Sequence, residues 1–514
     1  MLDPILEAVK RCDATGPPPS DTCPELAELV PPGMNIRDIA ASLDKLSSSA
    51  LDAIKCLRII QACLDSRQDS PQGTETEDLS SPLFEISEYV GRVILPVVPA
   101  SEDNDSEDVT SAAKTQFLLK GELGLNILRT LTNRHAFALN PTALLSAVAY
   151  TNPQDPWTSD ASADIARDLL RSQFSEAEGA PEKAASKGEF ITDTLLTQHL
   201  RPLFSKSRPA TVTASGRKAA FVEEQSSAML EDRAAKPWKY THVHAVTVFD
   251  WAVRNAAGAT TVKQPAASGA KDDTQPRQPL LAKTWHLFTP VLFTLLDESD
   301  TVLKVRALGI FGAFWSGCPP GLMGQVGLAS VFEDAVFPAV HFLPNITPED
   351  ESRIILNAAY PALFQLAGLV DCDSTSNSSE ATTSDILPMI SGIMTNPFET
   401  KHPQSVLAAT QLLQAILRCC WPRISAYRNE IIRALTVCWL NIADEDTWPT
   451  SDKTAPTKQE LETQLIKAAA LLSSVIRNDA QAGQDQPGTM LDDLVSPLVK
   501  KEPLLAPLFA SSPN

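Results

Sequence analysis

The sequence has few basic and few aromatic residues, and it has no long apolar run. Lys and Arg account for 43 of its 514 residues against 63 Asp and Glu, which gives a formal net charge of −20. Because such a chain repels phosphate backbones and anionic membrane surfaces, we expect neither a nucleic-acid partner nor a membrane partner. No run of 18 apolar residues is present, and residues 1–16 lack a charged segment followed by an apolar core. We therefore expect a soluble, unsecreted protein.

Motifs for catalysis and cofactor binding are also missing. The sequence holds no GxxxxGKS/T, GxGxxG, HExxH or GxSxG pattern and no paired CxxC. These absences remove the usual sequence support for binding phosphate, dinucleotide or zinc and for a nucleophile elbow. We expect a protein that is not an enzyme, with no cofactor and no catalytic or metal-ligating residue.

The nine cysteines are an odd number without paired spacing, and several lie beside Leu and Ile in apolar runs. This usage is typical of reduced, buried thiols in a cytosolic or nuclear protein. Cys419 and Cys420 are adjacent, and adjacent cysteines seldom bridge without strain. We therefore interpret the cysteines as packing residues.

Helical periodicity, by contrast, runs from end to end, and convincing strand patterns are absent. Residues 285–315 predict two apolar helices joined at residues 297–300. The first helix has one apolar face, and the second has two apolar stripes, as a helix inside a stack of helix pairs requires. The face of the first helix comprises Phe288, Val291, Leu292, Leu295 and Leu296. We predict an all-α fold, an α-solenoid of HEAT-like or armadillo-like repeats with long flexible loops.

The same patterns divide the chain into four parts. These are an N-terminal helical region (1–204), a flexible linker (205–235), a C-terminal HEAT-like domain (236–478) and a C-terminal tail (479–514). Low-complexity inserts at about 256–279 and 371–384 bury too little apolar surface to offset their ordering entropy, so we expect them to be disordered. Helices are expected over 36–65, 83–96, 114–133, 141–150, 161–174, 190–204, 326–343, 349–369, 385–394, 403–421, 425–443 and 457–478.

Two polar clusters could carry chemistry, and both favour a structural interpretation. His242 and His244 would point about 200° apart on a helix, so a single helix could not direct both at one metal ion. Asp297 and Asp300 precede Lys304 and Arg306 in the sequence. Pairing within the repeat and helix capping explain these charges better than acid–base catalysis.

The segment Lys236-Pro-Trp-Lys-Tyr240 has two interpretations that the sequence leaves open. Trp238 and Lys239 would contact a partner, since Trp is enriched in binding hot spots. Alternatively, the segment is the capped start of the helix that continues through Val246, Phe249 and Val253.

Five segments in a fixed order resemble the Tel-two-interacting protein two family. They are KPWK (236–239), VFDWAVRN (248–255), Pro290 with LLDE (295–298), VGLASVFEDAVFPAVHFLP (326–344), and ES followed by LNAAYPALFQLAG (351–368). The resemblance is clear over residues 236–370 and weaker over 400–445. Candidate partner contacts within or beside these segments are Trp238, Lys239, Phe332, Phe337 and Glu351.

The resemblance implies a non-enzymatic cochaperone subunit of the Triple-T complex. Its partners would be the Tel-two protein and Tel-two-interacting protein one, and indirectly the heat-shock chaperone machinery and phosphatidylinositol 3-kinase-related kinases such as TOR, ATM and ATR. The implied role is maturation of these kinases, with links to telomere maintenance and the DNA damage response, in cytoplasm and nucleus. The alternative is an armadillo or importin-type transport adaptor, which requires an ordered Trp/Asn array that the eight tryptophans do not form.

Overall fold

The protein is helical throughout the residues that its structure describes. The structure is a computed structural model and describes residues 36–48, 52–65, 79–98, 107–135, 137–174, 187–205, 234–256, 279–319, 321–342, 347–366, 403–424, 427–443, 457–482 and 489–509. These ranges hold helices and no β-strand, which confirms the predicted all-α class. None of their helices is both long and apolar enough to cross a membrane. The expected helix at 385–394, the insert at 371–384 and nearly all of the insert at 256–279 lie outside the described residues.

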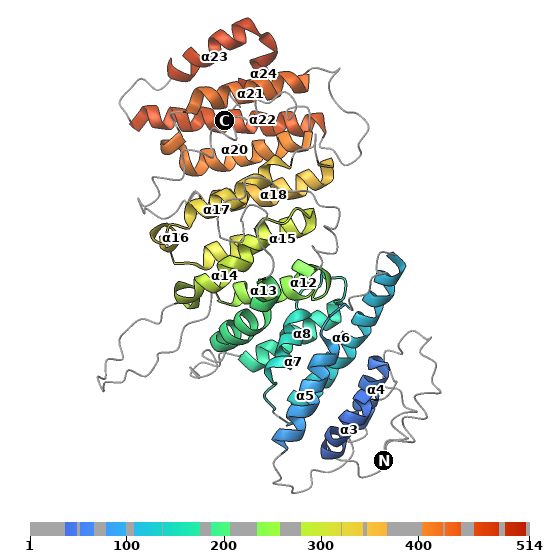
Figure 1. Ribbon diagram of the computed structural model, residues 1–514. Helices are drawn as coiled ribbons and strands as arrows, with labels where there is room; N and C mark the ends of the chain where they lie inside the picture. The colour runs from blue at the N-terminus through green and yellow to red at the C-terminus, as the bar shows by residue number, and fades with distance from the viewer. Residues whose placement is uncertain are drawn as a thin grey trace, which may run out of the picture. The chain divides into compact units, whose positions relative to one another are not determined.

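The chain divides into two compact units, residues Met1–Val291 and Leu292–Asn514. In chain order the described helices of the first unit, which can be followed in Figure 1, are α3 (Ile36–Ser48), α4 (Ala53–Asp65), α5 (Ser80–Ile94), α6 (Glu107–His135), α7 (Pro141–Ala149), α8 (Asp160–Phe174), η1 (Phe190–Leu200), α10 (Arg201–Phe204), α12 (Pro237–Tyr240) and α13 (Ala245–Ala256). Helix α14 (Leu280–Leu296) spans the division between the units.

In the first unit, helices α3 to α6 each pack on the next helix but one in chain order. Helix α3 packs on α5 and α5 on α7, while α4 packs on α6 and α6 on α8. Successive helices α5 and α6, and α7 and α8, also touch, and α13 continues the series by packing on α7. Each internal helix is therefore covered on more than one side, which requires apolar residues on more than one face.

Tyr150 holds three of these helices together at the end of α7. Its ring is fully buried, and its hydroxyl lies 2.7 Å from the carbonyl oxygen of Ile94 and 3.2 Å from that of Phe117. The ring packs directly on the backbone of α6 at Gly121, where a Cβ atom would lie only 2.3 Å from the tyrosine Cε1. Glycine is thus required at this position, because any side chain would displace the ring.

Helix η1 is a π-helix rather than an α-helix, although the sequence predicted only a helix at 190–204. Its buried residues recur every five positions, as Phe190 and Ile191, then Leu195 and Leu196, then Leu200. This spacing is too wide for an α-helix and suits i→i+5 hydrogen bonding. The amide of Arg201 accordingly donates to the carbonyl of Leu196.

Helices on both sides of the predicted linker at 205–235 belong to the first unit. Phe204 of α10 stacks on Trp238 of α12, with ring centroids 4.9 Å apart, and η1 packs on α13. The division between units falls instead near Val291. Most of the linker itself lies outside the described residues. The sequence placed the boundary at 205–235 because local composition does not reveal that the helices flanking a polar segment pack together.

The second unit continues from the end of α14. Its described helices are α15 (Thr301–Gly317), α16 (Leu322–Gln325), α17 (Ala329–Val336), η2 (Phe337–His341), α18 (Glu349–Leu366), α20 (Pro403–Ile424), α21 (Arg428–Ala443), α22 (Lys458–Ala482), α23 (Thr489–Lys501), η5 (Pro503–Leu505) and α24 (Ala506–Phe509). Figure 1 shows α15, α18, α20 and α22 in succession, and each of them packs on the next.

The predicted apolar face of residues 285–296 is confirmed. All five of its members, Phe288, Val291, Leu292, Leu295 and Leu296, are at most 4% exposed. In α15, one predicted stripe is buried through Ala307, Ile310 and Phe314, whereas Trp315 of the other stripe is half-buried. Asp300 caps α15 by accepting a hydrogen bond from the amide of Leu303 (3.1 Å), as predicted for the hinge.

Residues 489–509, which the sequence left as a tail, form helices that pack on the rest of the second unit. Helix α24 packs on α22, and η5 packs on α21. The indole nitrogen of Trp439 donates to the carbonyl of Leu504 over 2.8 Å. Leu505 and Leu508 are buried, which explains why this segment stays attached despite Pro497, Pro503 and Pro507.

Candidate functional site

The structure places Trp238 in the core of the first unit. The indole is 0% exposed and lies nearly parallel to the ring of Phe204, with an interplanar angle of 12°. Lys239 is half-buried, with its ammonium 5.8 Å from the centre of the Tyr240 ring. Of the two interpretations that the sequence left open, this geometry corresponds to a helix start packed against α10. Trp238 therefore offers no surface to a partner in this fold.

Replacing Trp238 with alanine should destabilise the first unit. Loss of a fully buried indole costs about 3–5 kcal/mol, which urea unfolding would detect as a lower midpoint. The half-buried neighbour supplies the control, because Lys239→Ala should change stability far less. Unaltered unfolding of Trp238→Ala combined with loss of partner binding would instead make Trp238 a contact residue.

Phe332 is likewise buried, at the centre of an aromatic cluster in the second unit. Its ring centroid lies 4.6 Å from that of Phe293, 5.2 Å from Phe311, 5.9 Å from Phe314 and 6.0 Å from Trp315. Phe332, which the sequence offered as a candidate partner contact, is therefore part of a core that joins α14, α15 and α17.

The two remaining candidates, Phe337 and Glu351, are half-buried and lie on η2 and α18. These two elements pack on each other. Both side chains are thus partly accessible, and both stay candidates for a contact with a partner.

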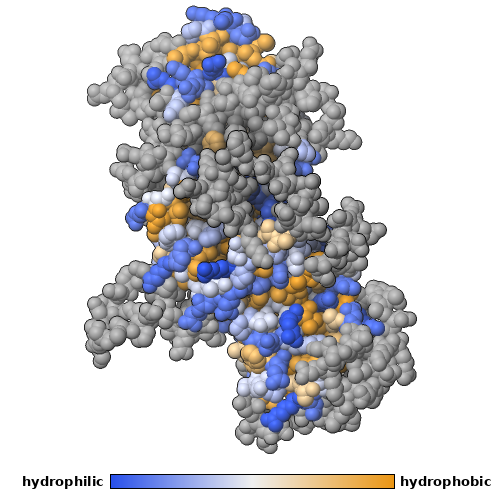
Figure 2. All heavy atoms as spheres, in the orientation of Figure 1, coloured by the Kyte–Doolittle hydropathy of each residue, from blue (hydrophilic) through white to orange (hydrophobic). Residues whose placement is uncertain are grey.

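Several apolar side chains that the sequence did not single out are exposed. Val302 is 75% exposed at the start of α15, Ile354 is 49% exposed on α18, and Val331 is 44% exposed on α17. Figure 2 shows apolar side chains reaching the surface in several separate places. Val302 and Ile354 fall outside the buried stripes of their helices, and this offset was the signal available in the sequence.

Val302 and Ile354 lie in the N-terminal parts of two helices, α15 and α18, that pack side by side. Near the other end of these helices, Gln365 of α18 donates to the hydroxyl of Ser316 on α15 (3.3 Å). Ser352 of α18 and Lys304 of α15 both contact Phe342, through its carbonyl and its ring respectively. Helices α15 and α18 therefore run parallel, which brings their N-terminal turns together.

Three histidines of the first unit lie close together. His199 lies on η1, whereas His242 and His244 lie in the turn between α12 and α13. The Nε2 atoms of His199 and His244 are 3.0 Å apart, and the ring centroids of His242 and His244 are 5.8 Å apart. The helical placement assumed for His242 and His244 is wrong, because both residues lie in the turn between α12 and α13.

The hydrogen bonds fix the protonation of the pair. The Nδ1 atom of His244 lies 2.7 Å from the carbonyl oxygen of Pro96. A carbonyl only accepts, so His244 carries its proton on Nδ1 and its Nε2 accepts from the Nε2–H of His199. The Nδ1 atom of His242 is buried and has no hydrogen-bond partner in the described part of the chain.

Burial makes all three histidines harder to protonate. Together with nearby His242, it lowers the pKa of His199 to about 4. Burial, with smaller contributions from His199 and His242, lowers the pKa of His244 to about 3, although the Pro96 carbonyl raises it. The pKa of His242 is also lowered by burial. The pair is therefore neutral at neutral pH.

The charges at the hinge between α14 and α15 are structural. Lys304 is 5% exposed, donates to the carbonyl of Leu296 at the end of α14, and lies 5.6 Å from the centre of the Phe342 ring. Burial lowers its pKa, while Asp297 and Glu298 raise it. A lysine that satisfies the last carbonyls of a helix stabilises the helix end, in agreement with the structural interpretation of this cluster.

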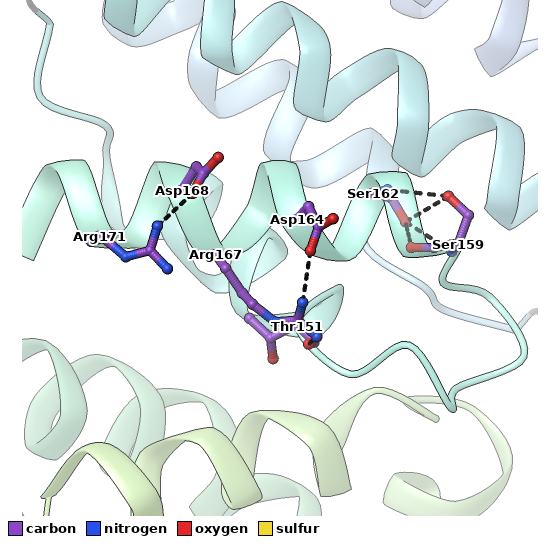
Figure 3. Close-up of polar contacts among 7 residues, drawn as sticks. All are labelled: Thr151, Ser159, Ser162, Asp164, Arg167, Asp168 and Arg171. Carbon is purple, nitrogen blue, oxygen red and sulfur yellow. Dashed lines mark hydrogen bonds and ion pairs between the residues drawn. The ribbon is translucent and has the colours of Figure 1, made fainter.

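Polar contacts along α8 also serve the fold (Figure 3). Ser159 and Ser162 exchange backbone-to-hydroxyl hydrogen bonds of 2.9 and 3.1 Å that cap the helix start. Arg167 joins Asp164 to the carbonyl of Thr151 at 2.8 and 3.0 Å, which ties α8 to the end of α7. The side chains of Arg167 and Asp164 are 41% and 73% exposed, so their ion pair contributes about 1 kcal/mol or less.

Cys56, Cys63 and Cys438 are buried, and Cys318 is half-buried. Burial raises the pKa of Cys63 to about 11 and that of Cys318 and Cys438 to about 12, which makes these thiols unreactive. The side chains of Cys419 and Cys420 lie outside the described residues. Among the residues described, no three His, Cys, Asp or Glu side chains are placed to hold a metal ion.

Comparison with known proteins assigns the chain to a family. The model of the Tti2 family matches residues 143–420, which run from α7 in the first unit to α20 in the second and make up more than half of the chain. The match begins well before the segments at 236–370 that carried the resemblance in the sequence. Neither a curated protein nor a solved structure matches the chain. The chain is a member of the Tti2 family.

Proposed function

We propose that this protein is a non-enzymatic scaffold subunit of the Triple-T complex. Its membership of the Tti2 family is the observation that carries the proposal. In this role it binds Tel-two-interacting protein one and the Tel-two protein, in cytoplasm and nucleus. The complex supports chaperone-dependent maturation and stability of phosphatidylinositol 3-kinase-related kinases such as TOR, ATM and ATR.

The mechanism proposed for this role is contact through an α-solenoid of HEAT-like repeats. In each unit, helices pack on the helix two or so places along the chain, as α4 does on α6 and α6 on α8, or α18 on α20 and α20 on α22. Stacked helix pairs produce this pattern, and such stacks present extended surfaces to partners.

The exposed N-terminal turns of α15 and α18 are the proposed place of contact with another helical subunit. Val302 and Ile354 are apolar and exposed, and they lie in the N-terminal parts of adjacent helices. Burial of such side chains at the centre of an interface would contribute to affinity, because removal of apolar surface from water is favourable. The half-buried Glu351 lies one turn before Ile354 on the same helix.

The double variant Val302→Asp, Ile354→Asp tests this contact. It should weaken binding of Tel-two-interacting protein one by about tenfold or more, because two carboxylates would be taken out of water on association. Co-expression, followed by affinity purification and titration of the purified subunits, measures the change. The matched control is Phe84→Asp, an exposed apolar residue of α5 in the first unit (46% exposed), which should leave binding unchanged.

The double variant should also keep the parent's circular-dichroism melt, because both side chains are exposed in the folded chain. Wild-type affinity with an unchanged melt would exclude this part of the surface. A complex that fails to form even with the parent chain would contradict the proposed function itself.

A further inference from the structure

The histidine pair connects three segments that are far apart in the sequence. His199 belongs to η1, His244 precedes α13, and Pro96 follows α5. The 3.0 Å contact between the two Nε2 atoms and the 2.7 Å bond to the Pro96 carbonyl join these segments in series. The two rings also stack, with centroids 5.1 Å apart and an interplanar angle of 22°. His244 is 0% exposed, so water does not replace these bonds in the folded unit.

A proton added to this pair disrupts it by geometry. Protonation of His244 at Nε2 would set two N–H donors against each other over 3.0 Å and leave both without an acceptor. Protonation of His199 at Nδ1 would place a cation against the buried His244, with the His242 ring centroid only 6.4 Å away. In either case the unfavourable contact is removed when η1 moves away and the imidazoles reach water.

Helix η1 is suited to such a movement, because it is a π-helix. Its i→i+5 bonding is rare, and π-helical turns are frequently found at functional sites. An α-helical register would not keep the five-residue spacing of its buried side chains, so the π form depends on packing against its neighbours. Those neighbours include α13, which follows His244 directly.

We propose that the His199–His244 pair is an acid-sensitive clasp that holds η1 on α13 and releases it when either imidazole is protonated. The closed clasp is the neutral pair with the protons on Nδ1 of His244 and Nε2 of His199. The released form exposes η1 together with the apolar residues of α13 that it covers.

The neighbouring groups favour the closed state near neutral pH. Other charged or titratable side chains on the elements around the pair are Glu85, Glu88, Tyr89 and Arg92 on α5, Tyr150 and Asp155 after α7, Asp193 on η1, Arg201 on α10, Lys239, Tyr240 and His242 at α12, and Asp250 and Arg254 on α13. Asp155 is hydrogen-bonded to Thr247, one turn beyond His244. Among the described residues, the side-chain charges that shift the pKa of His199 and His244 are those of the histidines themselves.

The direction of the pH effect follows from these pKa values. Both are lowered from an ordinary value of about 6.5, to about 4 for His199 and about 3 for His244. The open state therefore binds more protons than the closed state as the pH falls from about 6.5 towards 4, and the clasp weakens through this window. Each histidine that reaches water on opening should shift the equilibrium about twentyfold towards the open state when the pH falls from about 7 to about 5.

Hydrogen exchange of the full-length chain measures this opening. Protection factors, in which the intrinsic pH dependence of exchange is divided out, should fall about twentyfold or more for amides of η1 between about pH 7 and pH 5. Amides of α20 in the second unit should keep their protection over the same range. Equal protection of η1 at both pH values would overturn the proposal, as would a uniform loss of protection in all helices.

Two variants separate the clasp from general acid sensitivity. The amide of glutamine can donate to His244 Nε2 in place of His199, and it does not titrate. The fall in η1 protection between about pH 7 and pH 5 should therefore be about twentyfold smaller in His199→Gln than in the parent. The matched control is His286→Gln, which changes an exposed histidine on α14 and should keep the full effect. An unaltered pH effect in His199→Gln would overturn the proposal.

If His199→Gln does not fold, nitrogen-15 spectra of the parent decide the question. They should show His244 protonated on Nδ1 and His199 on Nε2 at neutral pH, and titration of both only well below the ordinary histidine range. Titration of either ring near pH 6.5 would contradict the clasp.

Discussion

Replacing Leu295 with aspartate is expected to unfold the second unit or to abolish its soluble expression. Leu295 is 0% exposed near the end of α14, in the apolar face that it shares with Leu292. Removal of the leucine side chain from such a site costs about 2–5 kcal/mol, and an unpaired buried carboxylate adds to that loss. The sum is on the order of 5 kcal/mol, comparable with the total stability of a typical domain, which is about 5–15 kcal/mol.

Urea unfolding followed by circular dichroism measures the effect of Leu295→Asp where the variant is soluble. The matched control is Val302→Asp, seven residues away and 75% exposed, which should change stability by about 0.5 kcal/mol or less. A melt of Leu295→Asp that matched the parent would show that the apolar face of α14 is not part of a core.

Replacing Gly121 with leucine is expected to destabilise the first unit by about 3 kcal/mol or more. A Cβ atom at this position would lie 2.3 Å from Cε1 and 2.6 Å from Cζ of Tyr150, closer than any real contact. The tyrosine cannot yield, because its ring is fully buried and its hydroxyl is held by the carbonyls of Ile94 and Phe117. The substitution therefore separates α6 from α7 or breaks both hydrogen bonds.

A large fall in the midpoint of thermal unfolding would report this loss. Glu122→Leu provides the comparison, since it adds the same side chain one residue away at an exposed position of the same helix. A Gly121→Leu protein as stable as Glu122→Leu would mean that α6 and Tyr150 are not in close contact. The pair of variants thus tests how the first unit is packed independently of any partner.

Local periodicity predicted the helices of this chain well. The stripe through Leu295 and the cap at Asp300 are determined by residues close together in sequence, and the structure confirms both. Asn140 accepts a hydrogen bond from the amide of Ala143 over 2.8 Å, with Pro141 in the first helical turn. Such features depend only on residues within about one helical turn of each other, so no knowledge of tertiary contacts is needed to predict them.

Features that depend on tertiary contacts were not predicted. The packing of Trp238 on Phe204 joins residues on opposite sides of a polar segment, and a single sequence does not show which apolar surface will cover an indole. From the sequence, Phe332 was a candidate contact with a partner. Only the close approach of Phe293 and Phe311 decides for the core.

The π-helical form of η1 illustrates a signal that was present but not used. Its apolar pairs recur at Phe190, Leu195 and Leu200, a spacing of five that a test for the α-helical period does not detect. The contact of His199 with His244 then follows from that helix and from the turn before α13. Because these segments are 45 residues apart, the histidine clasp was beyond the reach of local pattern analysis.

Reconstitution with the other Triple-T subunits tests the central claim most directly. The full-length chain would be co-expressed with Tel-two-interacting protein one and the Tel-two protein, purified through a tag on this chain, and separated by gel filtration with mass determination. The proposed scaffold role predicts one stoichiometric complex that survives gel filtration. A well-folded chain that elutes alone, with no measurable affinity for either subunit, would contradict it.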